Sequence, residues 1–240
     1  MKIISLKNRV ELEFFVANIL VKQVKEYPNS VLGLATGRTM LGIYEKILEI
    51  NQNEKIDFSN VKTFNLDEYC GLASDDPQSY HYYMHHNLFN HINIKKENVH
   101  VPNGASENLN DEIKNYEMRI KECGGIDLQL LGIGLNGHIG FNEPGTAFDS
   151  RTHIVELHEA TRKQNQQFFN GEDNVPKYAI TMGIGSILEA KKIVLVATGE
   201  EKREILKSAI NGEVNQLISA SVLQLHNNVT VITDIANLDV

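Results

Sequence analysis

The chain has 240 residues, a mass of 27.0 kDa and a formal net charge of −8. A negative field of this kind repels nucleic acids and anionic lipids, so neither a nucleic acid nor a membrane is an expected partner. Hydrophobic residues make up 42% of the chain, as in soluble globular domains, and no apolar stretch approaches the roughly 20 residues of a membrane span. Two cysteines are too few for a disulfide framework, which favours a reducing, cytoplasmic location.

Helices and strands are predicted to alternate along the first half of the chain. Apolar residues at helical spacing run from Val10 to Val24, and Pro28 then separates this helix from a buried strand over Val31 to Ala35. A second helix is expected over Met40 to Ile50, followed by a strand over Val61 to Leu66. The next predicted elements are helices over 79–91 and 107–122 and strands over 126–133 and 153–157.

The second half continues this alternation, with strands over 178–182, 192–197 and 229–233 and helices over 199–210 and 220–225. The pattern predicts an α/β fold with a doubly wound, mostly parallel sheet and helices on both faces, which is Rossmann-like. We expect one domain over residues 1–240, with the polar segment Gly171 to Pro176 as a surface loop. Ligands of such sheets bind beyond the carboxyl ends of the strands.

The loop after the first buried strand has the features of a phosphate site. Thr36, Gly37, Arg38 and Thr39 lead directly into a helix, whose amino terminus offers N–H groups and a positive dipole. The two hydroxyls and the Arg38 guanidinium add donors that suit a phosphate monoester. The lysine of a nucleotide P-loop is missing, so ATP is not implied. The alternative is that Thr36 or Thr39 only caps the helix.

Two adjacent carboxylates, Asp67 and Glu68, follow the strand that ends at Leu66. Neighbouring residues on an extended backbone point to opposite faces, so only one of the two can face a ligand. We expect one carboxylate to act chemically and the other to support it. The alternative is a pair of solvated loop acids.

Gly132, Gly134 and Gly137 have the GxGxxG spacing of a dinucleotide-binding turn. That fingerprint requires a helix to begin at the turn, whereas Pro144 and Gly145 follow too closely for one. We therefore reject a nicotinamide cofactor.

We expect the same glycines to form an exposed loop that presents Asn136, His138, Asn142 and Glu143. A carboxylate or amide partner orients an imidazole and fixes its tautomer, which a general acid/base at a sugar ring oxygen requires. The alternative is an ordinary solvated histidine. The histidines at 81, 85 and 86 lack the glutamate of a zinc-binding HExxH motif, so we assign them to a helix surface or to packing and predict no metal site.

The three loops GLATGRT, FNLDEYCGL and LGIGLNGHIGFNEPG together resemble the glucosamine-6-phosphate deaminase family. The similarity continues through SRTHIVEL, VPKYAITMGIGSIL and ISASVLQLH and so covers nearly the whole chain. It implies conversion of glucosamine 6-phosphate and water to fructose 6-phosphate and ammonium, in amino-sugar catabolism, without a cofactor. Galactosamine 6-phosphate is the nearest alternative substrate. The related 6-phosphogluconolactonases lack the Phe-Asn-Glu-Pro sequence after the loop histidine, so lactone hydrolysis is less favoured.

The resemblance implies a role for each site residue. Asp67 matches the base that moves the C2 proton, and His138 matches the group that opens the pyranose ring. Asn136 and Glu143 match the relay that supports this histidine. Phosphate contacts are implied at Gly37, Thr39 and Lys202.

Two departures from the family pattern lead to further expectations. Gln167 stands where an arginine is common, and Arg38 stands where a small residue is usual, so we expect Arg38 to supply the missing guanidinium to the phosphate. His153 and Val155 occupy a stretch that is basic in longer, allosteric relatives. We therefore expect hyperbolic kinetics without activation by N-acetylglucosamine 6-phosphate, from a monomer or small homo-oligomer. Residues from about 145 to 176 are expected to form a lid that excludes water from the enolamine intermediate.

Overall fold

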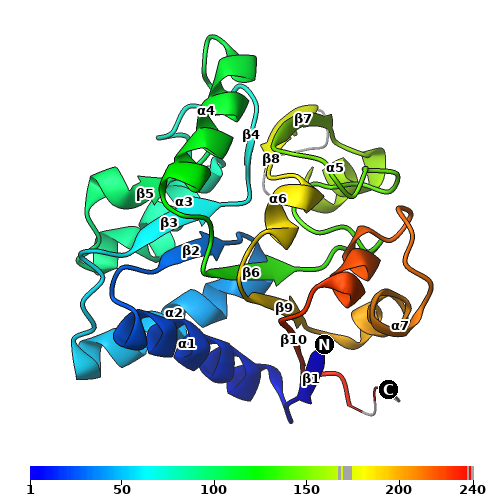
Figure 1. Cartoon of the computed structure of the whole chain (residues 1–240), viewed down its shortest axis with the longest axis horizontal. Helices are drawn as coiled ribbons and strands as arrows, with labels where there is room; N and C mark the ends of the chain where they lie inside the picture. The colour runs from blue at the N-terminus through cyan, green and yellow to red at the C-terminus, as the bar shows by residue number, and fades with distance from the viewer. Residues whose placement is uncertain (167–168, 170–174, 237, 239–240) are drawn as a thin grey trace.

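The computed structural model describes residues 1–166, 169, 175–236 and 238. Its centre is a seven-stranded parallel sheet with the strand order β1-β10-β9-β6-β2-β3-β5 (Figure 1). The predicted doubly wound parallel sheet is confirmed. The strands are β1 (Lys2–Ser5), β2 (Val31–Leu34), β3 (Lys62–Asn65), β5 (Val99–His100), β6 (Leu128–Gly132), β9 (Ile193–Ala197) and β10 (Val229–Thr233).

Helices cover both faces of this sheet. Figure 1 shows α1 and α2 together on one face and α4 across the other. The connection from β9 through α7 to β10 crosses the sheet in the direction opposite to that from β2 through α2 to β3, so right-handed crossovers put α7 on the face opposite α2. The α-helices are α1 (Arg9–Glu26), α2 (Arg38–Glu54), α3 (Tyr80–Asn87), α4 (Leu109–Glu122), α5 (Glu159–Asn165), α6 (Ile184–Leu188) and α7 (Arg203–Asn211).

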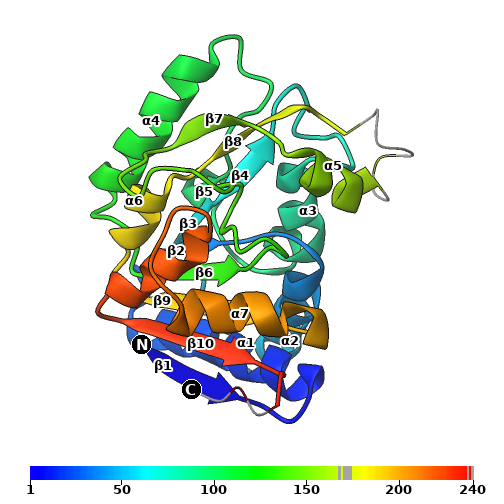
Figure 2. The same ribbon diagram turned by 90° about the vertical axis from the view of Figure 1, so that its right-hand side faces the viewer.

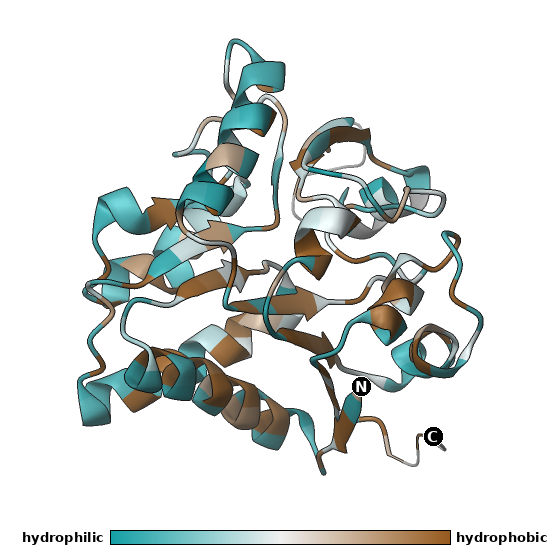
Figure 3. Cartoon of the chain, in the orientation of Figure 1, coloured by the Kyte–Doolittle hydropathy of each residue, from teal (hydrophilic) through white to brown (hydrophobic). Residues whose placement is uncertain are grey.

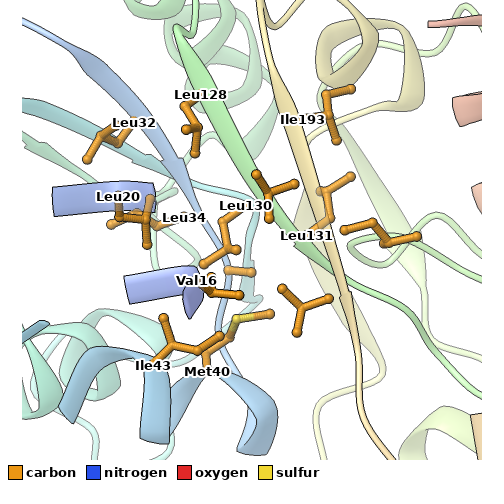
Figure 4. Close-up of a cluster of buried hydrophobic side chains, with 14 of the residues drawn as sticks. Val16, Leu20, Leu32, Leu34, Met40, Ile43, Leu128, Leu130, Leu131 and Ile193 are labelled. Carbon is orange, nitrogen blue, oxygen red and sulfur yellow. The ribbon is translucent and has the colours of Figure 1, made fainter. Parts of the chain in front are cut away.

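The main core lies between the α1–α2 pair and the central strands. Every residue of β2 and of β9 is buried, as expected for strands covered on both faces. Apolar side chains from both helices point at those of β2 and β6 (Figure 4), and β6 and β9 are largely hydrophobic (Figure 3). Burying each such side chain stabilises the fold by about 1.5–3 kcal/mol. The core side chains include Val16, Leu20, Leu32, Leu34, Met40, Ile43, Leu128 and Leu130.

A second sheet of three antiparallel strands lies beside the first (Figure 2). Its order is β4 (Asp67–Tyr69), β8 (Tyr178–Thr181) and β7 (His153–Glu156), and Asp67 pairs with Thr181. The chain passes from β3 of the large sheet to β4 of the small sheet through Leu66. Asp67 and Glu68, which follow Leu66, therefore belong to the small sheet and not to the large one.

The structure corrects several predicted elements. The carboxylates after Leu66 were expected in a loop but lie in β4, because that short segment pairs with a strand more than 100 residues later. The short edge strands β1 and β5 were not predicted. The helix expected over 79–91 breaks at Leu88 into α3 and a 3-10 turn (Phe89–His91), and the helix expected over 220–225 is a 3-10 helix (Ser219–Leu225).

The segment predicted to be a lid, 145–176, contains β7 and α5. Residues 167–168 and 170–174 lie outside the described residues, and with them Gln167 and most of the predicted surface loop from Gly171 to Pro176. Val175, at the end of that loop, is buried. Within the described ranges, no helix has both the length and the apolar character needed to cross a bilayer.

The strand order reverses between β2 and β6. From β2 the chain winds outward to β3, whereas from β6 it winds in the other direction through β9 to β10. In open α/β sheets such a reversal leaves a crevice at the carboxyl ends of the two strands, where ligands bind. The loops that begin at Ala35 and at Ile133 flank this position.

Candidate active site

A cavity of about 580 Å³ opens at this reversal of strand order. It is lined by the loops after β2, β6 and β9, by β4, and by side chains of α3 and α5. Asn136 and Glu143 lie behind His138 rather than on the cavity wall. The predicted site residues that line the cavity are Thr36, Gly37, Arg38, Thr39, Asp67, His138 and Lys202.

One end of the cavity is the amino terminus of α2. Gly37 is the N-cap residue with φ of 105°, a conformation that favours glycine, and no side chain caps the helix. The alternative role of Thr36 or Thr39 as a cap is therefore wrong. The Thr36 hydroxyl bonds to Tyr80 instead, and the Thr39 hydroxyl lies 3.4 Å from that of Thr198.

Lys202 reaches the same end of the cavity from the loop after β9. Its Nζ donates to the Ile133 carbonyl oxygen at 2.8 Å, and burial lowers the pKa of this ammonium group. Together with Arg38, which begins α2, it brings two cationic side chains to the cavity, which Glu201 also lines. The arrangement suits an anion at a helix terminus.

Sequence reasoning missed residues that support the phosphate loop. Arg9 of α1 donates to the Arg38 carbonyl oxygen at 2.8 Å, and the Tyr83 hydroxyl of α3 donates to the Gly37 carbonyl oxygen at 2.8 Å. Thr198 follows β9 and lines the cavity. Nothing local in the sequence marks these residues, because the tertiary fold alone brings α1, α3 and β9 to this loop.

The side chains of the two adjacent acidic residues, Asp67 and Glu68, have different surroundings. Asp67 lines the cavity and is 7% exposed, and no hydrogen bond to its carboxyl group is formed within the described part of the chain. Glu68 is buried and accepts backbone N–H bonds from Tyr69, Tyr80 and His81, each at 2.9 Å. Glu68 therefore ties β4 to the start of α3, and Asp67 is left open to a ligand.

Burial is the main reason why the pKa of Asp67 rises to about 8, with a smaller contribution from the neighbouring charge of Glu68. A carboxyl group in this environment holds a proton near neutral pH and becomes a stronger base once it ionises. Perturbed groups in a cavity of this kind are candidates for proton transfer.

His138 is held by a chain of hydrogen bonds. Its Nδ1 lies 2.6 Å from Oδ1 of Asn136, whose Nδ2 donates to Oε2 of Glu143 at 2.9 Å. The Asn136 oxygen accepts and its amide nitrogen donates, so the hydrogen on His138 is at Nδ1. Nε2 then carries the lone pair. Burial lowers the pKa of His138, which favours this neutral form.

Two glycines of the GxGxxG pattern shape this loop. A Cβ at Gly134 would lie 2.3 Å from Cε1 of His138, so the imidazole rests directly on the Gly134 backbone. Gly137 has φ of 85°, and a Cβ there would lie 2.7 Å from Ile218. Residues 133–152 are all described and contain no helix, which agrees with the rejection of a dinucleotide turn.

Asn142 and Glu143 were expected on the surface of an exposed loop, but both are buried, and Glu143 is only 8% exposed. Asn142 is fully buried, and its Nδ2 donates to the carbonyl oxygens of Ile139 at 2.8 Å and Met182 at 2.9 Å. Asn142 therefore fastens the loop to the end of β8. The sequence pattern grouped Asn142 with the other polar residues of the loop and gave no sign that Asn142 is buried.

The three histidines at 81, 85 and 86 lie on α3, as predicted for a helix surface. The rings of His81 and His85 are 4.4 Å apart. Among the described residues, no group of three or more His, Cys, Asp or Glu side chains could hold a metal ion.

The fold and the cavity together define an α/β protein that binds a small ligand at the point where its parallel sheet reverses order. The chain matches, over residues 10–232, the family described as glucosamine-6-phosphate isomerases/6-phosphogluconolactonase. It belongs to this family.

Curated relatives cover nearly the full chain. A glucosamine-6-phosphate deaminase of Thermoanaerobacter sp. (strain X514) is 56% identical over 98% of this chain and 92% of its own length. A protein of the same name from Clostridium botulinum (strain Langeland) is 53% identical over 98% of this chain and 96% of its own length.

Solved structures agree with the fold. A structure described as a monomeric glucosamine-6-phosphate deaminase has a TM-score of 0.97 and 46% identity, and covers 99% of this chain and 100% of its own. The 6-phosphogluconolactonase of Trypanosoma cruzi has a TM-score of 0.77 but 21% identity, and covers 100% of this chain and 97% of its own. The second likeness shows a shared fold alone.

Proposed function

We propose that the protein is a glucosamine-6-phosphate deaminase, which converts glucosamine 6-phosphate and water to fructose 6-phosphate and ammonium. One observation carries the proposal: Asp67 and His138 line the same cavity as the amino terminus of α2. Two separate proton-transfer groups and an anion site are what ring opening and isomerisation of a phosphorylated amino sugar need. The curated relatives at 56% and 53% identity carry this name.

The phosphate would bind at the α2 terminus, between Gly37, Thr39 and Lys202. Donors from the α2 terminus and from the loop after β9 fix the far end of the substrate and so orient its reacting carbons. Arg38 borders the same end of the cavity, and we assign it the role of the guanidinium that the family commonly has at the position of Gln167.

His138 would open the pyranose ring. Because its Nδ1 hydrogen faces Asn136, Nε2 is available to take the proton from the anomeric hydroxyl and return it to the ring oxygen. The Asn136 amide does not ionise, so Glu143 supports the resulting imidazolium by its charge and does not receive the proton.

Asp67 would act on the open chain. Its ionised carboxylate removes the C2 proton, which is acidified by the neighbouring aldehyde, and a proton delivered to C1 converts the enolamine to a ketimine. Water then adds to C2, the C2–N bond breaks, and ammonia leaves and is protonated. Water has to be kept from the enolamine until C1 is protonated, which is the role we propose for the predicted lid.

The first test compares ammonium release from glucosamine 6-phosphate and galactosamine 6-phosphate, with fructose 6-phosphate and tagatose 6-phosphate measured as products. Faster turnover of the gluco sugar supports the proposal. Faster turnover of the galacto sugar would assign the protein to the other epimer, and no turnover of either would overturn deamination altogether.

Replacement of Arg38 tests its assignment to the phosphate. We expect Arg38→Ala to raise the KM for the phosphorylated sugar about tenfold and to leave kcat within about twofold, since a hydrogen bond to a charged group contributes about 1.5–3 kcal/mol. Arg151→Ala is the matched control, because Arg151 pairs with Glu189 and lies outside the cavity. An unchanged KM in Arg38→Ala would exclude the assignment.

The oligomeric state and the kinetics are further parts of the proposal. We propose a cytoplasmic monomer or small homo-oligomer, and we expect hyperbolic rate curves that N-acetylglucosamine 6-phosphate does not alter. Light scattering coupled to size-exclusion chromatography, together with initial rates measured with and without that compound, checks both points. A sigmoidal curve or a rate increase would count against this expectation.

A further inference from the structure

We propose that Thr161 of α5 is a positioning residue for His138, acting through Glu143 and Asn136; the proposal rests on the proposed function. The Thr161 hydroxyl donates to Oε1 of Glu143 at 2.5 Å. Oε2 of the same carboxylate accepts from Asn136, which in turn holds Nδ1 of His138. The chain of hydrogen bonds therefore has four members and ends in α5.

The burial of these groups makes the contact consequential. Thr161 is 5% exposed and Glu143 is 8% exposed, so water supplies little compensation if the hydroxyl is removed. A carboxylate held by two donors keeps one orientation, and this orientation sets the Asn136 amide and hence the tautomer of the imidazole. Loss of one donor would free the carboxylate to rotate.

The contact between Thr161 and Glu143 joins two different parts of the fold. The loop that carries His138, Asn136 and Glu143 follows β6 of the large sheet, whereas Thr161 lies in the segment that includes β7 and α5. Asn165, one helical turn later on the same face of α5, donates to the Tyr69 hydroxyl at 3.0 Å. One face of α5 therefore makes two contacts near the proposed proton-transfer groups. Thr161 contacts the hydrogen-bonded chain that holds His138, and Asn165 contacts β4, the strand that carries Asp67.

The helix that forms part of the cavity wall also supports the tautomer of His138. Thr161 and Asn165 both line the cavity, so α5 forms part of its wall. When α5 is in this position, the relay has its full set of donors. The hydrogen bonds that set the His138 tautomer therefore end in a helix that forms part of the cavity wall.

Thr161→Val removes the hydroxyl and keeps the shape and the branching at Cβ. We expect kcat to fall about tenfold with KM changed less than about threefold, in line with the 10- to 100-fold effects of partners that orient catalytic ligands. Thr161→Ser should restore both values.

Thr146→Val is the matched control on the same glutamate. The Thr146 hydroxyl donates at 2.7 Å to the Glu143 backbone carbonyl oxygen, which also accepts the Thr146 N–H, so this carbonyl stays bonded in the variant. We expect its kcat to stay within about twofold of wild type. Equal losses in the two valine variants, wild-type kcat in Thr161→Val, or a loss confined to KM would overturn the proposal.

A spectroscopic measurement separates this proposal from the proposed function. If the wild-type protein released no ammonium, the function would fail, and Thr161 would still be tested by ¹⁵N spectra of the His138 ring, assigned with a His138→Gln sample. We expect one Nδ1–H tautomer in wild type, Thr161→Ser and Thr146→Val, and a mixture in Thr161→Val. A single unchanged tautomer in Thr161→Val would overturn the positioning role.

Discussion

Asp67→Asn should lower kcat for glucosamine 6-phosphate by about 10³-fold or more, because an amide cannot remove the C2 proton and a positioned base contributes up to about 10⁴-fold. In deuterium oxide, wild-type protein should place solvent deuterium on the carbons between which the proton moves. The variant should place none. NMR of the recovered sugars measures this exchange directly.

Binding provides the control for this variant. The Asp67 carboxyl accepts no hydrogen bond within the described part of the chain, so its replacement should leave the phosphate end intact and calorimetric binding of the substrate largely unchanged. Retained turnover with normal exchange would remove Asp67 from the chemistry.

The raised pKa of Asp67 also sets a pH dependence. The base must be ionised to act, so kcat/KM of the wild-type protein should fall as pH drops below about 8, the pKa of Asp67 without substrate. The folded state holds this proton more tightly than the unfolded state, so this group's contribution to stability falls as pH rises from its ordinary value of 3.8 towards 8. Asp67→Asn should therefore unfold at no lower temperature than wild type at pH 8.

His138→Gln is expected to lower kcat by about 10²- to 10³-fold by slowing ring opening. If ring opening becomes rate-limiting, cleavage of the C2–H bond no longer affects the rate. The kinetic isotope effect on kcat with substrate deuterated at C2 should then fall towards one.

Asp67→Glu is the matched control for this isotope measurement. It displaces the carboxylate and makes proton removal at C2 slow, so its isotope effect should be at least as large as that of wild type. A full isotope effect in His138→Gln would place the imidazole at the carbon proton instead of the ring.

The sheet could be predicted from the sequence wherever a strand has its own apolar run. The runs at β2, β6, β9 and β10 are continuous and β-rich, and the structure confirms a strand at each. Strands β1, β4 and β5 have two to four residues and depend on pairing with distant segments, so no local pattern marks them. The small sheet was missed because β4 pairs with β8 far along the chain.

The site shows the same division. Residues that share a loop, such as Asn136 and His138, could be grouped from their spacing, and the opposite directions of Asp67 and Glu68 follow from extended backbone geometry. Thr161 could not be connected to Glu143 in this way. Threonine is common on protein surfaces, and the contact joins it to a loop 18 positions earlier in the chain. Arg9 reaches Arg38 across 29 positions for the same reason.

The passage of the chain from one sheet to the other has a consequence for rate. Leu66 lies between β3 and β4, and its N–H donates to Leu34 of the large sheet while its carbonyl oxygen accepts the Met182 N–H at the end of β8. Asp67 lies in β4 of the small sheet and His138 lies in the loop after β6 of the large sheet, so the connection through Leu66 helps to set the distance between the two groups. A substitution at Leu66 would change the distance between the Asp67 carboxylate and the His138 imidazole. It would therefore change the rate.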